Sequence, residues 1–148
     1  MRDGGSAESY AYGLGIQSDG KIVATGRAQF GSAVSSLVRV GSDGALDASF
    51  GSDGQSDTCG SYSNVVFDSD GSITSTAQTL GIPTMWAICK VSPNGAGFSQ
   101  SGVTGGSYDS ATAVAFQADG KLVVGGRNVN HGPAIVRFGS DGWIDPSF

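Results

Sequence analysis

The side chains of this sequence that could do chemistry are few and scattered. Asp68-Ser69-Asp70-Gly71 is the closest match to a calcium loop, since Ca²⁺ prefers several oxygen ligands from closely spaced carboxylates. The motif supplies two carboxylates, and Asp70 occupies a turn position that recurs at Asp19 and Asp119. Asp68 and Asp70 are therefore weak calcium candidates, and a structural turn is the simpler interpretation.

The two cysteines and the single histidine indicate no metal site. No Cys-x-x-Cys motif or histidine cluster supports zinc. The sequence consists of three repeated units, described below. Cys89 aligns with valines of the other two units, which predicts a core position, whereas Cys59 stands at the start of the first predicted strand of its unit. These positions lie at opposite ends of an up-and-down blade, beyond the reach of a disulfide, so we expect two unpaired thiols. His131 has no repeated acid beside it, which favours a surface loop over a catalytic or ligand-binding role.

The elements that carry these residues belong to three copies of one unit. The segments 11–27, 62–78 and 111–127 align without gaps, and the segments 37–50, 88–98 and 135–148 form a second aligned set. The repeat is about 50 residues long, close to the period of propeller blades. We therefore expect one domain over residues 1–148, with units at about 4–53, 54–102 and 103–148.

Each unit has the pattern of short β-strands joined by tight turns. The first strand of the first unit alternates the large residues Leu14 and Ile16 with glycine, a period of two. A second and a third strand follow. A weaker fourth strand is expected after Gly44, Gly95 and Gly142.

Most of the negative charge belongs to the turns. Asp-Gly occurs seven times, because glycine adopts the positive φ of a hairpin turn and aspartate hydrogen-bonds the backbone there. A basic residue also recurs in the third strand, with an acid further along two of the units. The repeated positions are Arg39, Lys90 and Arg137 for the base, and Asp47 and Asp145 for the acid. This pattern predicts a structural ion pair within a unit rather than a binding site.

These motifs resemble the delta-60 repeat of bacterial proteins. QSDGKIVATG and LVRVGSDGALDASFG in the first unit match its pattern closely, as do QADGKLVVGG and IVRFGSDGWIDPSF in the third. The middle unit is weaker, because Ser72 replaces the lysine and the LDxSF segment is shortened to AGF. The resemblance implies β-propeller blades, often in surface or secreted proteins. It implies no known activity and no catalytic residues.

Three four-stranded blades cannot close a propeller, because propellers typically have about 4–8 blades and open ends would expose sheet edges. The repeat phase continues across a seam between two copies: Asp53 follows Phe50 by three residues, and Asp3 of a next copy would follow Phe148 by three. We therefore expect a six-bladed homodimeric ring with two-fold symmetry. The alternatives are a nine-bladed trimer, a fragment of a longer chain and a monomeric β-trefoil. Against the trefoil, this sequence has no repeated Gln-x-Trp motif.

Composition limits the class of partner. The net charge of −5 argues against binding to nucleic acid and to anionic membranes. No apolar run approaches the ~20 residues of a membrane span, and the segment MRDGGSAES has no apolar core of a signal peptide. No nucleophile arrangement or cofactor fingerprint is present, so we expect a non-catalytic structural or interaction module without a cofactor.

The loops between the second and third strands differ most between units, and a ligand site would be expected there. The candidate residues are Gln29, Phe30, Met85, Trp86, Asn128, Asn130 and His131. A carbohydrate-binding propeller is the alternative function, motivated by aromatic and amide side chains in these loops. Against it, Trp86 and Trp143 do not occupy equivalent positions, whereas a repeat lectin usually has one stacking aromatic per unit.

Overall fold

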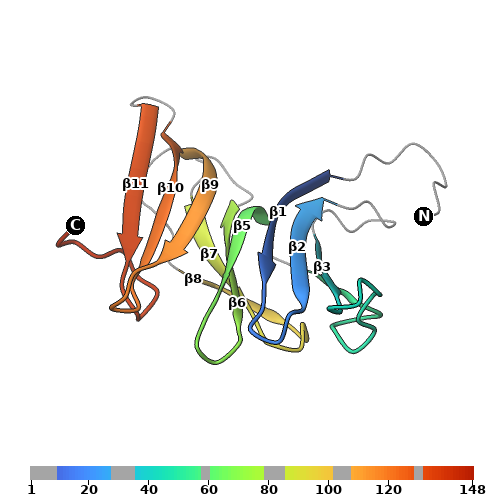
Figure 1. Cartoon of the computed structure of the whole chain (residues 1–148). Coiled ribbons are helices and arrows are strands. Elements are labelled where there is room, and N and C mark those ends of the chain that lie inside the picture. Colours follow the sequence, from blue (N-terminus) through green and yellow to red (C-terminus); the bar gives the residue numbers. More distant parts are fainter. Residues whose placement is uncertain (1–9, 28–35, 58–60, 79–85, 102–107, 129–131) are drawn as a thin grey trace.

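The computed structural model describes residues 10–27, 36–57, 61–78, 86–101, 108–128 and 132–148. Within these ranges the chain forms eleven β-strands and no helix, which confirms the all-β prediction. The same ranges therefore contain no helix long and apolar enough to cross a membrane. Figure 1 shows three small sheets side by side, which we call blades 1, 2 and 3 in chain order.

Each blade is an antiparallel meander whose strands follow one another in the sheet. Blade 1 contains β1 (Tyr10–Ile16), β2 (Ile22–Arg27), β3 (Ser36–Val40) and β4 (Gln55–Asp57). Blade 2 contains β5 (Ser61–Phe67), β6 (Ile73–Gln78), β7 (Trp86–Val91) and β8 (Phe98–Ser101). Blade 3 contains β9 (Tyr108–Phe116), β10 (Leu122–Asn128) and β11 (Gly132–Phe138).

The predicted Asp-Gly and Asn-Gly turns are confirmed wherever the structure describes them. Gly20 has a φ of 82°, and the other turn glycines of this kind have similar positive values. In all of these turns except Asp53-Gly54, the preceding side chain accepts a hydrogen bond from the backbone N–H two residues on, as from Lys21 to Asp19 (3.1 Å) and from Ala96 to Asn94 (3.0 Å). Local backbone chemistry thus closes each hairpin, and it occupies these carboxylates.

Consecutive blades pack face to face, with β1 against β5 and β5 against β9. Blade 1 presents Gly13 and Gly15 to blade 2. A Cβ added at Gly15 would lie 2.7 Å from the Phe67 ring and 2.8 Å from Val65. At this junction the large residues of blade 2 therefore pack on the small residues of blade 1, which is the physical use of the alternation seen in the first unit.

Two apolar clusters occupy the contacts between blades, which we call junction 1–2 and junction 2–3. The cluster of junction 1–2 contains Val23, Leu37, Phe50, Val65, Ile73, Ala87, Cys89 and Val91. The cluster of junction 2–3 contains Trp86, Ile88, Ala111, Val114, Leu122, Val124 and Phe138. The core therefore lies between the blades, and each blade needs a neighbour to bury its faces.

In blade 2 the fourth strand follows the turn glycine as predicted, since β8 begins three residues after Gly95, whereas in blade 1 it comes later. After Gly44 the chain makes isolated bridges, first between Val40 and Leu46 and then from Gly51 and Ser52 to Gln55, where β4 begins. The reason is a tight turn between Gly44 and β4. In it the Phe50 N–H donates to the Asp47 carbonyl (3.0 Å), so the chain leaves the ladder of hydrogen bonds between strands at this point. In blade 3 the described residues form three strands, with an isolated bridge between Phe138 and Ile144.

The expectation of two unpaired thiols is wrong. Cys89 is disulfide-bonded, and the one other cysteine of the sequence, Cys59, lies outside the described residues. The error came from placing Cys89 at a strand end. Cys89 lies inside β7, where it pairs with Ser75.

Candidate functional site

The repeated basic and acidic residues form a polar cluster at the edge of blade 1. Arg39 Nε donates to Asp47 Oδ2 (2.8 Å), and Lys21 Nζ lies 3.2 Å from the same oxygen. The guanidinium of Arg39 also lies over the ring of Phe50, 4.4 Å from its centroid. From blade 1 it reaches blade 2, where Arg39 Nη1 donates to the Pro93 carbonyl (2.7 Å).

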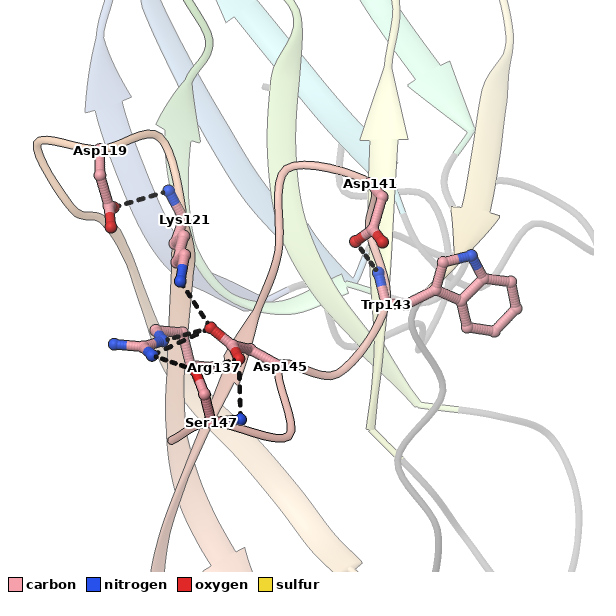
Figure 2. A network of polar contacts seen from close by, with 7 residues as sticks. All are labelled: Asp119, Lys121, Arg137, Asp141, Trp143, Asp145 and Ser147. Carbon is pink, nitrogen blue, oxygen red and sulfur yellow. Dashed lines mark hydrogen bonds and ion pairs between the residues drawn. The ribbon is translucent and has the colours of Figure 1, made fainter.

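Blade 3 repeats this cluster with the same geometry (Figure 2). Arg137 Nε and Lys121 Nζ donate to Asp145 Oδ2 at 2.9 Å and 2.8 Å. Arg137 lies over Phe148 at 4.6 Å from the ring centroid, and Ser147 donates to Asp145 Oδ1 (2.6 Å). The sequence prediction of a structural ion pair within these units is therefore confirmed.

Hydrogen bonds and charge stabilise the ionised form of both cluster carboxylates. The Ser49 hydroxyl, with Lys21 and Arg39 nearby, holds the pKa of Asp47 well below its usual range. The Lys121 ammonium and the Ser147 hydroxyl do the same for the pKa of Asp145. These carboxylates are acceptors fixed in an ion pair, which does not suit them to general acid or base catalysis near neutral pH.

Blade 2 carries a different version of the cluster. Lys90 stands at the position of Arg39, and its Nζ lies 2.8 Å from Asp68 Oδ2 and 3.7 Å from Asp70 Oδ2. The Asp68 carboxylate raises the pKa of Lys90. The cation between these two carboxylates is thus the lysine ammonium, so the geometry gives the weak calcium candidate no support. In the described ranges no group of three or more His, Cys, Asp or Glu side chains could hold a metal ion.

The predicted loop site is largely outside the description. Gln29, Phe30, Met85, Asn130 and His131 lie outside the described residues. Trp86 is wrongly predicted as a loop residue, because it begins β7, is 0% exposed and packs against Gly126 of blade 3. Asn128 ends β10 as a half-buried strand residue. The described residues therefore bring no ligand site together at this end of the blades.

The first face of blade 1, which we call the leading face, is unexpectedly apolar. Leu14 and Ile16 of β1 are 63% and 65% exposed. Their equivalents in the next blades pack against a neighbour: Val65 is 6% and Val114 is 8% exposed. Leu14 therefore occupies a position that both internal junctions bury.

The last face of blade 3, which we call the trailing face, shows the complementary set. Ala113 and Ala115 are exposed at the positions of Gly13 and Gly15. Ile135 and Phe148 are 64% and 61% exposed, whereas their blade 1 equivalents Leu37 and Phe50 are completely buried. These two faces were not predicted from the sequence. The repeat alignment identifies them only once it is known that the equivalent residues at the internal junctions are buried.

Comparison with known proteins supports the architecture. Residues 17–50 and 117–148 match a family described as a domain of unknown function (DUF5122), beta-propeller. These segments lie in the first and third units and leave out the divergent middle unit. No curated protein matches the sequence significantly.

A solved structure has the same fold over almost the whole chain. It is the crystal structure of a protein of unknown function from Dyadobacter fermentans DSM 18053, with a TM-score of 0.65 and 13% sequence identity. The likeness covers 93% of this chain and 49% of that chain, so this chain spans about half the length of its relative. At this identity the likeness concerns the fold alone. Together with the three sheets, these comparisons show that the chain is built of β-propeller blades, of a kind similar to the DUF5122 beta-propeller family.

Proposed function

We propose that this chain is a non-catalytic interaction module whose three blades form half of a ring closed by a second copy. The observation that carries the proposal is the match between its two end faces. The leading face exposes large residues at positions that both internal junctions bury, and the trailing face exposes small residues at the positions of Gly13 and Gly15 in junction 1–2. Placing one on the other would repeat the kind of contact that junction 1–2 makes within the chain.

The size of the exposed side chains supports this pairing. Leu14 and Ile16 would lie on the alanine face of the second copy, at Ala113 and Ala115, as Val65 and Phe67 lie on Gly15 within the chain. Monomeric proteins rarely leave apolar patches of this kind open to water. Two such contacts, related by a two-fold axis, would bury all four end faces.

The free edge of blade 3 is consistent with continuation. In blades 1 and 2 the third strand pairs with a strand on each side, β3 with β2 and β4, and β7 with β6 and β8. Among the described residues β11 has only β10 as a partner strand. The alignment covers 49% of the Dyadobacter chain, so that chain has about as many residues outside the matched part as within it. A fold that continues beyond three blades is consistent with this.

A glycan-binding function has less support than the sequence suggested. Trp86, its best-placed aromatic, is buried in junction 2–3. The charged side chains of the polar clusters are held in ion pairs within the blades, so they are not candidates for sugar recognition. We therefore retain the interaction module as the proposal.

The mass in solution tests the ring. We expect a particle of twice 14.8 kDa in sedimentation at micromolar concentration, and dissociation on dilution. The variants Leu14→Asp and Ala113→Arg each damage one end face, and each should weaken self-association by about 100-fold or more, because a charge would be buried in the contact.

Mixing these two variants separates the proposed pairing from others. Each variant keeps one intact face, and the two intact faces are complementary, so the mixture should form a heterodimer through one sound contact. Ser18→Asp, at an exposed turn position, serves as the control and should leave the mass unchanged. A wild-type chain that stays at 14.8 kDa at high concentration would overturn the ring, as would variants that do not complement each other.

A further inference from the structure

A cavity of about 460 Å³ opens at the turn end of junction 2–3. Its floor is apolar, formed by Phe67, Ile88, Phe116 and Leu122, and its rim carries Asp68, Ser69, Lys90, Ser99, Gln117 and Ser140. The volume lies within the range of about 300–1,000 Å³ typical of small-ligand sites. It combines an apolar base with a few polar groups above it.

Comparison of the two junctions explains why this cavity exists. In junction 1–2 the Phe50 ring is completely buried and packs together with Val23, Leu37 and Ile73. The equivalents of these three residues, by the repeat alignment, are Thr74, Ile88 and Leu122, and all three line the cavity. The middle unit lacks the LDASFG segment that carries Phe50. Its shorter connection starts β8 at Phe98, whose backbone pairs with Val91 in the sheet.

The filled junction also shows which contacts hold the missing segment. The Phe50 ring lies so close to Gly95 that an added Cβ there would be 2.8 Å from a ring carbon. The next residue, Gly51, donates its N–H to the Asn94 carbonyl (2.7 Å). In junction 2–3 the equivalent of Gly95 is Gly142, which lines the cavity. An aromatic side chain followed by glycine is therefore the occupant that this kind of junction accommodates.

The charges around the cavity favour an uncharged side chain. Lys90, at the position of Arg39, is already paired with Asp68 at 2.8 Å and lies close to Asp70. This leaves little net positive charge to attract a phosphate or a sulfate. The lysine still stands where Arg39 covers the Phe50 ring, so it could lie over an aromatic guest in the same manner.

We propose that the cavity of junction 2–3 binds a peptide segment of a partner protein through an aromatic side chain followed by glycine. The bound segment would replace, in trans, what the chain's own residues 47–51 provide in junction 1–2. The inference deepens the proposed interaction role but does not depend on ring closure, because blades 2 and 3 belong to one chain.

The test uses a labelled peptide with the sequence of residues 47–53, titrated into the whole protein and followed by fluorescence anisotropy. We expect saturable binding, with at least about a 10-fold weaker affinity when the phenylalanine of the peptide is replaced by alanine. Ser69→Trp and Ala118→Trp place bulk at the rim from blade 2 and blade 3 respectively, and each should weaken binding about 10-fold or more. Both positions are exposed, so the substitutions should leave the fold intact.

Ser18→Trp is the matched control, because Ser18 is the equivalent of Ser69 at the filled junction 1–2, and it should leave binding unchanged. Lys90→Gln should weaken binding about 2–5-fold, as expected for loss of a cation over a ring. Absence of saturable binding, equal binding of the alanine peptide, or indifference to both rim variants would each overturn the proposal. The mass of the protein, measured in parallel, reports on the ring separately.

Discussion

Phe50 and Phe148 end two copies of the same motif, and each lies under the equivalent arginine of its own blade, but their surroundings differ completely. Arg39 and Arg137 cover their rings at 4.4 Å and 4.6 Å, and each arginine holds the equivalent aspartate. Phe50 is nevertheless fully buried, whereas Phe148 is 61% exposed. The polar cluster is therefore a property of a single blade, and burial of the aromatic is a property of a pair of blades.

This distinction separates what one blade forms by itself from what needs a second blade. The ion pairs and the Ser147 hydrogen bond of blade 3 (Figure 2) form without a following blade, and so does the stacking of Arg137 on the Phe148 ring. What blade 3 lacks is the apolar surface that blade 2 supplies to Phe50 through Gly95 and the strands behind it. Because the polar cluster of blade 3 is intact, the exposure of Phe148 does not reflect a degenerate repeat: no described blade packs on its ring.

The largest expected effect comes from making the same substitution at both phenylalanines. Phe50→Ala should lower the free energy of unfolding by about 3–5 kcal/mol, because it leaves a cavity in junction 1–2. Phe148→Ala should cost a dilute, unassociated chain less than about 0.5 kcal/mol, because its ring is mostly in water. Urea unfolding at low protein concentration measures both.

The same pair of variants also reports on association. Phe148→Ala should weaken self-association by about 10-fold or more, whereas Phe50→Ala should leave the end faces unchanged. Equal losses of unfolding free energy in the two dilute variants would contradict the division between blade and junction.

A second prediction concerns the contrast between blade 2 and its neighbours. Cys89 stands where blades 1 and 3 have Val38 and Val136. It is disulfide-bonded and belongs to the cluster of junction 1–2. Cys59→Ser should lower the free energy of unfolding by about 2–4 kcal/mol, since the unfolded chain loses a covalent constraint. Adding a reductant to the wild type should produce the same shift in Tm, and should have no effect on the variant.

The smallest expected effect is a pH dependence shared by blades 1 and 3. Because the folded chain holds the pKa of Asp47 and Asp145 below the ordinary value of 3.8, both carboxylates stabilise the fold above that pH. This stabilisation is lost as the pH falls from about 4 towards the lowered pKa values. The unfolding midpoint should therefore fall on acidification.

Asp145→Asn removes one of these two contributions and supplies the control. Its unfolding midpoint, followed by circular dichroism between pH 6 and pH 2, should be lower than wild type at the upper end and should change less with pH. A variant that loses stability in parallel with wild type across the whole range would show that Asp145 is not among the groups responsible.

The features that could be predicted from the sequence are those that local chemistry or repetition determines. The turns follow from aspartate and glycine side by side, and the Arg39–Asp47 pair follows from two positions that vary together between units. The blade architecture follows from the length and the alternation of the repeat. None of these depends on the exact register of one strand against another.

The features that could not be predicted depend on register and on neighbours. The position of the disulfide-bonded Cys89 inside the strand depends on where β7 begins and ends. Trp86 looked like a loop residue because its aligned partners are Ser35 and Pro133. In the structure β7 begins at Trp86, the last residue of the expected loop, and the Trp86 side chain is buried. The cavity depends on a segment that one unit lacks, which becomes meaningful only when the filled junction is seen.

The unequal shapes of the two ends have a consequence for how copies can join. Two leading faces would set Leu14 and Ile16 against the same bulky pair, and two trailing faces would leave a void between alanines, so copies can add only head to tail. A head-to-tail contact closes when its rotation completes a turn, and otherwise it grows into an open fibre. The twist between neighbouring blades, and not the chemistry of the contact, therefore separates a finite particle from a polymer.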